Sequence, residues 1–82
     1  MNQINDKETF NEILSNLVGQ NTEIKILEQD GNVVTGKVTL HNYGGTIFAG
    51  QLLMPSVQIY CRSDGLRKNI VVNNIKAIYL PD

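Results

Sequence analysis

Three side chains in this sequence carry chemistry that could serve a functional site: His41, Tyr43 and Cys61. His41 is the only histidine, and as a general base it would need a nucleophile and an orienting partner, which its sequence neighbours do not supply. Cys61 alternates with Val57 and Ile59 on an apolar phase, where most cysteines are small buried hydrophobic residues. No second cysteine could complete a disulfide or a metal site. The sequence therefore predicts a protein that is not an enzyme and uses no metal or cofactor.

Tyr43 lies between Asn42 and the pair Gly44 and Gly45, a composition typical of a loop. An exposed aromatic ring can stack on an unpaired nucleic-acid base, although a loop tyrosine more often packs on the rim of its own barrel. His41 could stack on a base in the same way or simply lie at the surface. Both rings are therefore candidates for base stacking, with surface packing as the alternative.

The distribution of charge limits the ligands that the chain can bind. Its net charge is −1, which argues against strongly electrostatic binding of nucleic acid. Residues 1–30 carry six acidic and two basic side chains, a net charge of −4, and residues 31–82 carry five basic and two acidic ones, a net charge of +3. Arg67 and Lys68 could contact phosphate, but a basic pair after the turn signal Asp64–Gly65 is more typical of a solvated hairpin.

The first element that the sequence predicts is a helix over about residues 6–18. Asn5 is placed to cap it together with Glu8, and Gly19 is placed to end it. Its apolar stripe has helical spacing and consists of Phe10, Ile13, Leu14, Leu17 and Val18.

Two glycines indicate how the strands that follow are shaped. Asp30–Gly31 separates two apolar-alternating runs and predicts a tight hairpin, because glycine reaches positive φ without steric cost. Gly36 falls inside the second run and shares a face with Val34 and Val38. A glycine there marks a sharp bend or the close approach of another backbone. Such a bent hairpin is the opening of a small, strongly curved barrel.

Further strands are expected beyond the loop at residues 41–46. One starts near Thr46, includes residues 47–53 and is interrupted by Pro55, and the next is the alternating run over residues 57–62.

The last two runs, residues 70–72 and residues 75–80, are separated by a turn at Asn73–Asn74 and are apolar on both phases. Strands covered on both faces have this pattern, and the second cover could come from another copy of the chain. We therefore predict a cyclic homo-oligomer closed by strand addition between subunits.

Several of these features together resemble the Sm/LSm-like (Hfq-related) family over roughly residues 10–46. They are the helix leading into Leu17–Val18–Gly19, the strand with Ile24 and Ile26, and Gly36 five residues after Gly31. The resemblance implies a mainly β fold, a small, strongly bent, five-stranded SH3-like barrel with an N-terminal α-helix. It also implies rings in which the fourth strand of one subunit pairs with the fifth of the next. The whole chain, residues 1–82, is then one domain, with the barrel over about residues 22–81.

The resemblance further implies that single-stranded RNA binds where loops 41–46 and 73–74 surround a central pore. The candidate RNA-binding residues are His41, Asn42, Tyr43, Thr46, Asn73 and Asn74. His41 and Tyr43 are candidates for base stacking because they are aromatic, and the other four stand at positions that the resemblance implies. Asn42 stands where the family has an acidic residue, Thr46 where it has an asparagine, and Asn73–Asn74 where it has an Arg–Gly turn. The domain architecture favours a ring-forming protein that binds single-stranded RNA in RNA metabolism, and this is the predicted function. The near-neutral charge and the missing arginine favour the alternative, a structural or adaptor barrel that binds proteins without nucleic acid.

The sequence shows neither a basic-then-apolar leader nor an apolar run long enough to span a bilayer. It therefore predicts a cytoplasmic protein that does not bind a membrane or a small-molecule substrate. The expected partners are further copies of this chain, together with single-stranded RNA or protein.

Overall fold

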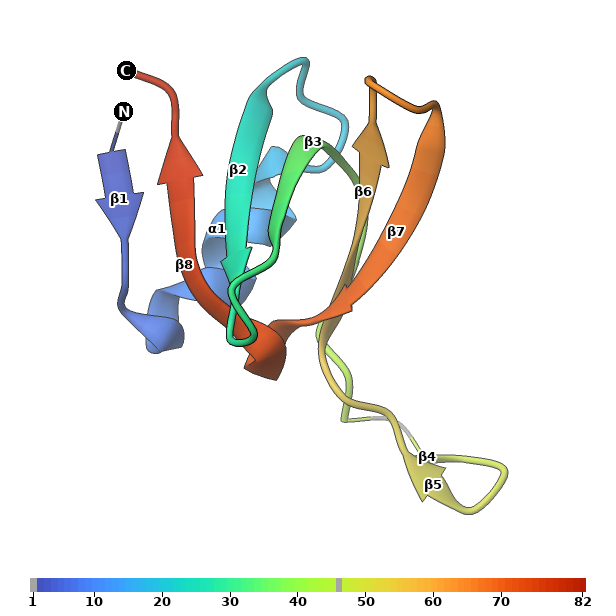
Figure 1. Cartoon of the computed structure of the whole chain (residues 1–82). Helices are drawn as coiled ribbons and strands as arrows, with labels where there is room; N and C mark the ends of the chain where they lie inside the picture. Colours follow the sequence, from blue (N-terminus) through green and yellow to red (C-terminus); the bar gives the residue numbers. More distant parts are fainter. Residues whose placement is uncertain (1, 46) are drawn as a thin grey trace.

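The computed structural model describes residues 2–45 and 47–82 and is mainly β, with one short α-helix near the N-terminus (Figure 1). Six antiparallel strands form one curved sheet in the order β1-β8-β2-β3-β6-β7, and β4 and β5 form a separate two-stranded hairpin. The prediction of a mainly β fold with an N-terminal helix is confirmed.

The strands are β1 (Asn2–Ile4), β2 (Glu23–Glu28), β3 (Val33–Asn42), β4 (Ile47–Phe48), β5 (Gln51–Leu52), β6 (Ser56–Cys61), β7 (Leu66–Val71) and β8 (Ile75–Leu80). The helical elements are the 3-10 helix η1 (Lys7–Thr9), the α-helix α1 (Phe10–Leu17) and the 3-10 helix η2 (Val72–Asn74).

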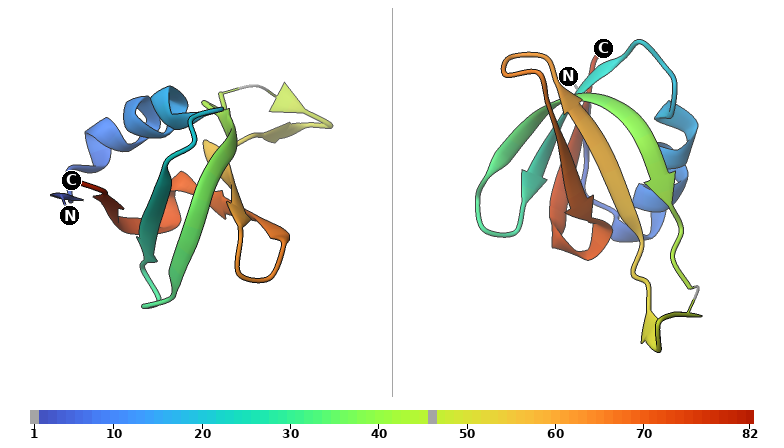
Figure 2. Two further views of the ribbon diagram at one scale, coloured as in Figure 1. Left: turned by 90° about the horizontal axis from the view of Figure 1, so that it is seen from above. Right: turned by 90° about the vertical axis from the view of Figure 1, so that its right-hand side faces the viewer.

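The helical segment begins and ends close to the positions expected from its apolar stripe. Its first turn is the 3-10 helix η1, and the cap is Asp6 rather than Asn5: the Asp6 side chain accepts a hydrogen bond from the Glu8 amide at 3.1 Å. Gly19, with φ +77°, follows the last turn as expected. Phe10 and Leu14 are completely buried, so the helix packs its apolar stripe on the sheet, which Figure 2 shows from two further directions.

Gly36 lies where the backbone of β3 comes very close to that of β6. Of the two alternatives that the sequence left open, a sharp bend or the close approach of another backbone, the second is confirmed. A Cβ atom at this position would overlap the Tyr60 carbonyl oxygen and lie 2.8 Å from Ile59 Cγ2. The hairpin before it is also confirmed, because β2 and β3 pair across the Asp30–Gly31 turn, where Gly31 has φ +93°.

The strand expected over residues 47–53 is wrong, and its starting residue, Thr46, lies outside the described residues. Residues 47–52 form the β4–β5 hairpin, which does not join the main sheet, and the strand that pairs with β3 is β6. The apolar residues of this segment suggested a position in the sheet, but within the described residues they pair only with each other.

A strand that the sequence pattern did not indicate, β1, lies on the outer edge of β8, with Gln3 opposite Tyr79. The resemblance assigns that edge to a neighbouring subunit, so the structure places a segment of the same chain where the ring contact was expected. β8 is also buried on both phases within one chain, through Ile75, Ala77 and Ile78. Its apolar pattern therefore needs no second copy to explain it.

Candidate binding surfaces

The two loops nominated for binding lie at the same end of the sheet. Asn42 at the end of β3 is opposite Ser56 in β6, which is itself opposite Val71 in β7. The amide of Val72 donates a hydrogen bond to the Pro55 carbonyl oxygen at 2.9 Å, which fixes η2 beside the end of β3. The structure thus brings residues 41–43 and residues 73–74 to one end.

The rings of His41 and Tyr43 touch each other, although His41 lies in β3 and not in the loop predicted over residues 41–46. His41 and Tyr43 have ring centroids 4.6 Å apart at an interplanar angle of 89°, an edge-to-face contact. His41 Nε2 lies 2.9 Å from Asn11 Oδ1, a hydrogen bond that ties β3 to α1. Partial burial lowers the pKa of His41 below its usual value of 6.5, so its ring is neutral at neutral pH. Tyr43 is 61% exposed, and its ring is the one open to a ligand.

The asparagines nominated beside these rings are exposed, and two of them already make turn contacts. Asn42 Oδ1 accepts a hydrogen bond from the Gly44 amide at 2.7 Å, and the Asn74 carbonyl oxygen accepts one from the Gln29 amide at 2.8 Å. Asn74 also lines a shallow hollow with Glu28, Gln29 and Asp30. The two carboxylates make this hollow unfavourable for a phosphate group.

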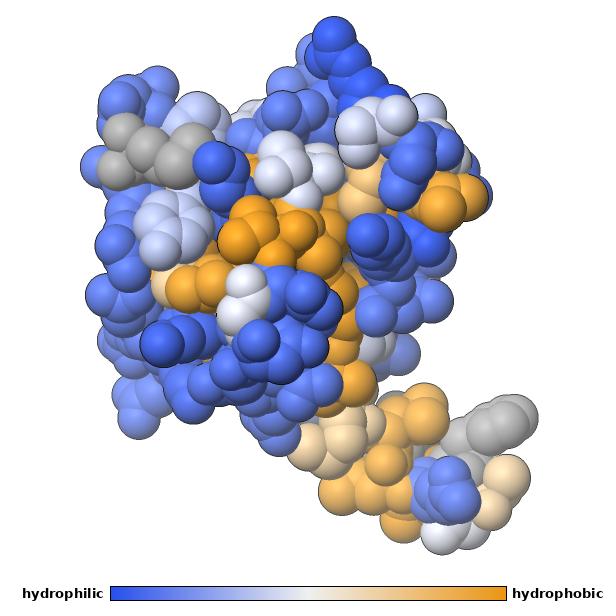
Figure 3. Space-filling view, in the orientation of Figure 1, coloured by the Kyte–Doolittle hydropathy of each residue, from blue (hydrophilic) through white to orange (hydrophobic). Residues whose placement is uncertain are grey.

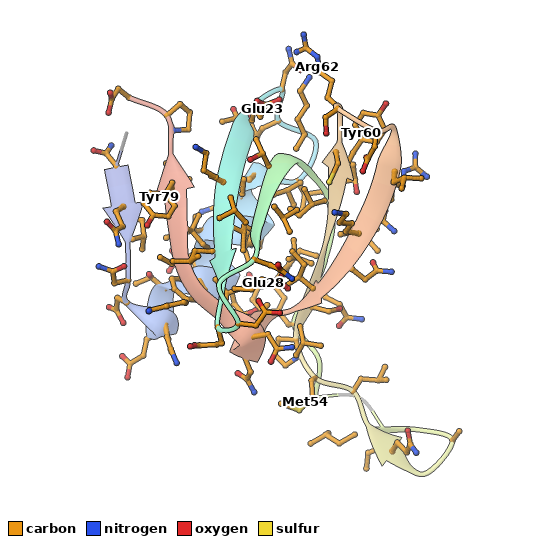
Figure 4. The ribbon with its side chains drawn as sticks, viewed as in Figure 1. Glu23, Glu28, Met54, Tyr60, Arg62 and Tyr79 are labelled. Atoms are coloured by element: carbon orange, nitrogen blue, oxygen red, sulfur yellow. The ribbon has the colours of Figure 1, made fainter. Side chains whose placement is uncertain are left out.

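The basic side chains of β7 and of the turn before it lie towards the opposite end of the sheet from Tyr43. Arg62 follows the end of β6, and Arg67 is opposite Tyr60 near the β6–β7 turn. The five steps from Ser56 to Cys61 along β6 separate the two ends by roughly 17 Å. Figure 4 shows Arg62 and Tyr60 at one end, with Glu28 and Met54 at the other. Phosphate contacts by these cations and base stacking on Tyr43 therefore belong to different ends.

The hairpin β4–β5 and the two residues after it form an apolar arm, defined here as residues 47–54, which projects from the body (Figures 1 and 3). Ile47 is 73% exposed and Leu52 is 61% exposed, and Leu53 and Met54 are exposed as well. Figure 3 shows this projection as largely hydrophobic beside a body whose visible face is mostly hydrophilic. Exposed apolar groups gathered in this way mark an interaction site.

The base and the tip of the arm depend on residues with positive φ. At the base, the Gly45 amide donates to the Leu53 carbonyl oxygen at 2.9 Å, and a Cβ atom at Gly44 would lie 2.6 Å from that same oxygen. At the tip, Ala49 has φ +52° and Gly50 has φ +78°, values that fit a tight two-residue hairpin turn. The two strands of the hairpin, β4 and β5, are therefore held together at the base and at the tip of the arm.

Sequence reasoning missed the arm, although a signal was available. Residues 38–61 contain no Asp, Glu, Lys or Arg, and the arm is framed by glycines and by Pro55. A long uncharged stretch with turn residues at both ends indicates an apolar loop as much as a strand.

The outer edge of β7 is a second candidate surface. Within the described parts of the chain, β7 pairs only with β6, and this leaves one side of its six residues without a neighbouring strand. Leu66, Arg67, Lys68, Asn69 and Val71 are all exposed on it, and Ile70 is buried.

Metal ligands, the single cysteine and membrane-spanning helices are considered next for the described residues. These residues contain no group of three or more His, Cys, Asp or Glu residues able to hold a metal ion. Cys61 is buried in the core, as its apolar alternation predicted. No helix in the part of the chain that the structure describes is both long and apolar enough to cross a membrane.

Comparisons of the chain with protein-family models, with curated proteins and with solved structures each found no match.

Proposed function

We propose that the chain is a five-stranded SH3-like barrel of the Sm type that serves as a non-catalytic binding module. Two features support the barrel. β2 pairs with both β3 and β8, so the first and last of the five strands β2, β3, β6, β7 and β8 are neighbours. The three-residue η2 connects β7 to β8, which stand four places apart in the pairing order. So short a connection requires the sheet to curl until its two sides approach each other.

The ligand that we propose is an extended segment of a partner protein, which binds as an added strand on β7. The single observation that carries this proposal is the open outer edge of β7 over Leu66–Val71. An edge strand directs backbone N–H and C=O groups outward, and these groups can hydrogen-bond to the backbone of an extended peptide. The chain would then act as an adaptor, because strand addition holds a partner protein through backbone hydrogen bonds and side-chain contacts and involves no chemical reaction.

The side chains of β7 define the kind of segment that fits. Arg67 and Lys68 are exposed on the strand, and Arg62 lies in the turn before it. An acidic segment is attracted to these cations, whereas the β7 strands of two copies would bring like charges together. Leu66 and Val71, exposed at the two ends of the strand, offer apolar contacts.

Selection of short random peptides by display on the whole chain tests this proposal. We expect the selected peptides to be acidic and to slow hydrogen exchange at amides of Leu66–Val71. The charge-reversal variant Arg67→Glu/Lys68→Glu should weaken their binding on the order of tenfold or more, because each attractive pair becomes repulsive.

The matched control is Lys76→Glu, which reverses an exposed cation on β8 and should leave peptide binding nearly unchanged. Peptides that bind without altering exchange in β7 would contradict strand addition there.

A second candidate function is the binding of single-stranded RNA at the end of the sheet that carries Tyr43. The observation that favours it is the exposed Tyr43 ring, held edge-to-face against His41 at the end of the sheet that also carries the exposed Asn73 and Asn74. A base stacked on such a ring contributes roughly 1–3 kcal/mol to binding. The carboxylates of Glu28 and Asp30 beside Asn74 oppose phosphate there, so this candidate ranks second.

Titration with a mixed-sequence single-stranded RNA at low salt tests the second candidate. Tyr43→Ala should abolish binding, whereas Tyr60→Ala, which removes an exposed tyrosine at the other end of the sheet, should not. No binding by the parent chain at low salt, where phosphate contacts are strongest, would contradict the RNA proposal.

A further inference from the structure

We propose that the apolar arm, residues 47–54, is a dimerisation element, through which two copies of this chain associate about a two-fold axis. The β4–β5 hairpins of the two copies would lie edge to edge and bury the arm's apolar side chains against each other. This surface is separate from the β7 edge, and the inference does not depend on the proposed function.

The main sheet of the chain does not support the arm. β4 and β5 pair with each other through two residue pairs, Ile47 with Leu52 and Phe48 with Gln51, and they form a sheet separate from the other six strands. Ile47 and Leu52 remain largely exposed although they face each other across the hairpin. An isolated two-stranded hairpin is marginally stable in water, and three or more strands are needed for independent stability.

A second copy of the chain would supply the additional strands that the two-stranded hairpin lacks. Each two-stranded hairpin has two open edges, so two arms placed edge to edge form one four-stranded antiparallel sheet. The pairing also covers Leu52, Leu53 and Met54, which are exposed in one chain.

The absence of charge on the arm favours a second copy of the chain as its partner. In a two-fold contact the same surface patch of each copy meets that of the other, so a patch carrying charge of a single sign would repel its copy. Residues 38–61, which include the arm and the segments on both sides of it, carry no Asp, Glu, Lys or Arg. The arm is therefore compatible with itself, and it offers no charge for recognising a chemically different partner.

Sedimentation equilibrium of the whole chain across a wide concentration range tests the proposal. We expect the parent to approach twice the chain mass of 9.1 kDa. Leu52→Asp should weaken self-association on the order of tenfold or more, because it places a carboxylate from each copy in the apolar contact. Leu52 is 61% exposed and lies outside the core, so this variant should keep the parent's melting temperature at concentrations where both proteins are monomeric.

The matched control is Val33→Asp, which places the same charge at a residue that is 54% exposed at the start of β3. This variant should dimerise like the parent. A parent that stays monomeric throughout, or a Leu52→Asp variant that dimerises as tightly as the parent, would overturn the proposal.

The result is distinguishable from failure of the proposed function. The variant Arg67→Glu/Lys68→Glu should lose peptide binding and keep the dimer, whereas Leu52→Asp should lose the dimer and keep peptide binding. If Leu52→Asp loses both, the dimer proposal stands, and the assignment of peptide binding to the β7 edge alone fails.

Discussion

At the scale of single residues, Gly36 has the clearest structural requirement. Gly36→Val should destabilise the fold by about 2 kcal/mol or more, although valine favours strands, because its Cβ would overlap the Tyr60 carbonyl oxygen where β3 crosses β6. Urea unfolding measures this change. Thr35→Val, at the exposed neighbouring position, should change stability by less than about 0.5 kcal/mol. Equal stability of the two variants would show that the backbones can separate without cost.

His41 should make the fold sensitive to mild acid. Burial lowers the pKa of His41 in the folded chain, so the unfolded chain binds the proton more tightly. His41 therefore has no effect on stability well above its usual pKa of 6.5, and it reduces stability as the pH falls through that value towards the lower folded pKa. Urea unfolding at neutral and mildly acidic pH should show a steeper loss of stability for the parent than for His41→Gln. Parallel losses in the two proteins would mean that His41 does not contribute.

At the scale of elements, local patterns predicted the parts of the fold that depend on neighbouring residues. The stripe containing Phe10 and Leu14 predicted a helix, because helical periodicity is visible within a few turns of sequence. Asp30–Gly31 predicted the β2–β3 hairpin for the same reason. Gly36 also predicted a close approach, although the sequence could not say that β6 was the strand that approaches.

The elements that could not be predicted depend on residues distant in sequence. β1 has three residues and no pattern of its own, and it exists as a strand because β8 lies beside it. Ile47 and Leu52 have the composition of strand residues, and only the arrangement of the other strands shows that β6 pairs with β3 in place of this segment. The nominated loops do lie at one end of the sheet, but the carboxylates beside Asn74 come from the β2–β3 turn, more than forty residues earlier.

At the scale of the whole molecule, the two halves of the chain do not form an acidic side and a basic side. Glu23, from the acidic half, and Arg62, from the basic half, lie at the same end of the sheet (Figure 4). The surfaces proposed for binding instead differ in kind, because β7 is basic and the arm carries no charge. A chain with two such surfaces can associate with itself and with an acidic segment at the same time.

The strand β1 acts as a tethered competitor for the edge of β8. Only Asn5 and Asp6 separate it from η1, so its effective concentration at that edge is on the order of millimolar. A neighbouring copy present at micromolar concentration meets a handicap of about a thousandfold there, equivalent to about 4 kcal/mol. A ring closed through β8 therefore requires an incoming strand that pairs more strongly than the three residues of β1 by at least that margin. Among the described residues no strand occupies the outer edge of β7, so the partner strand proposed there would meet no such competitor.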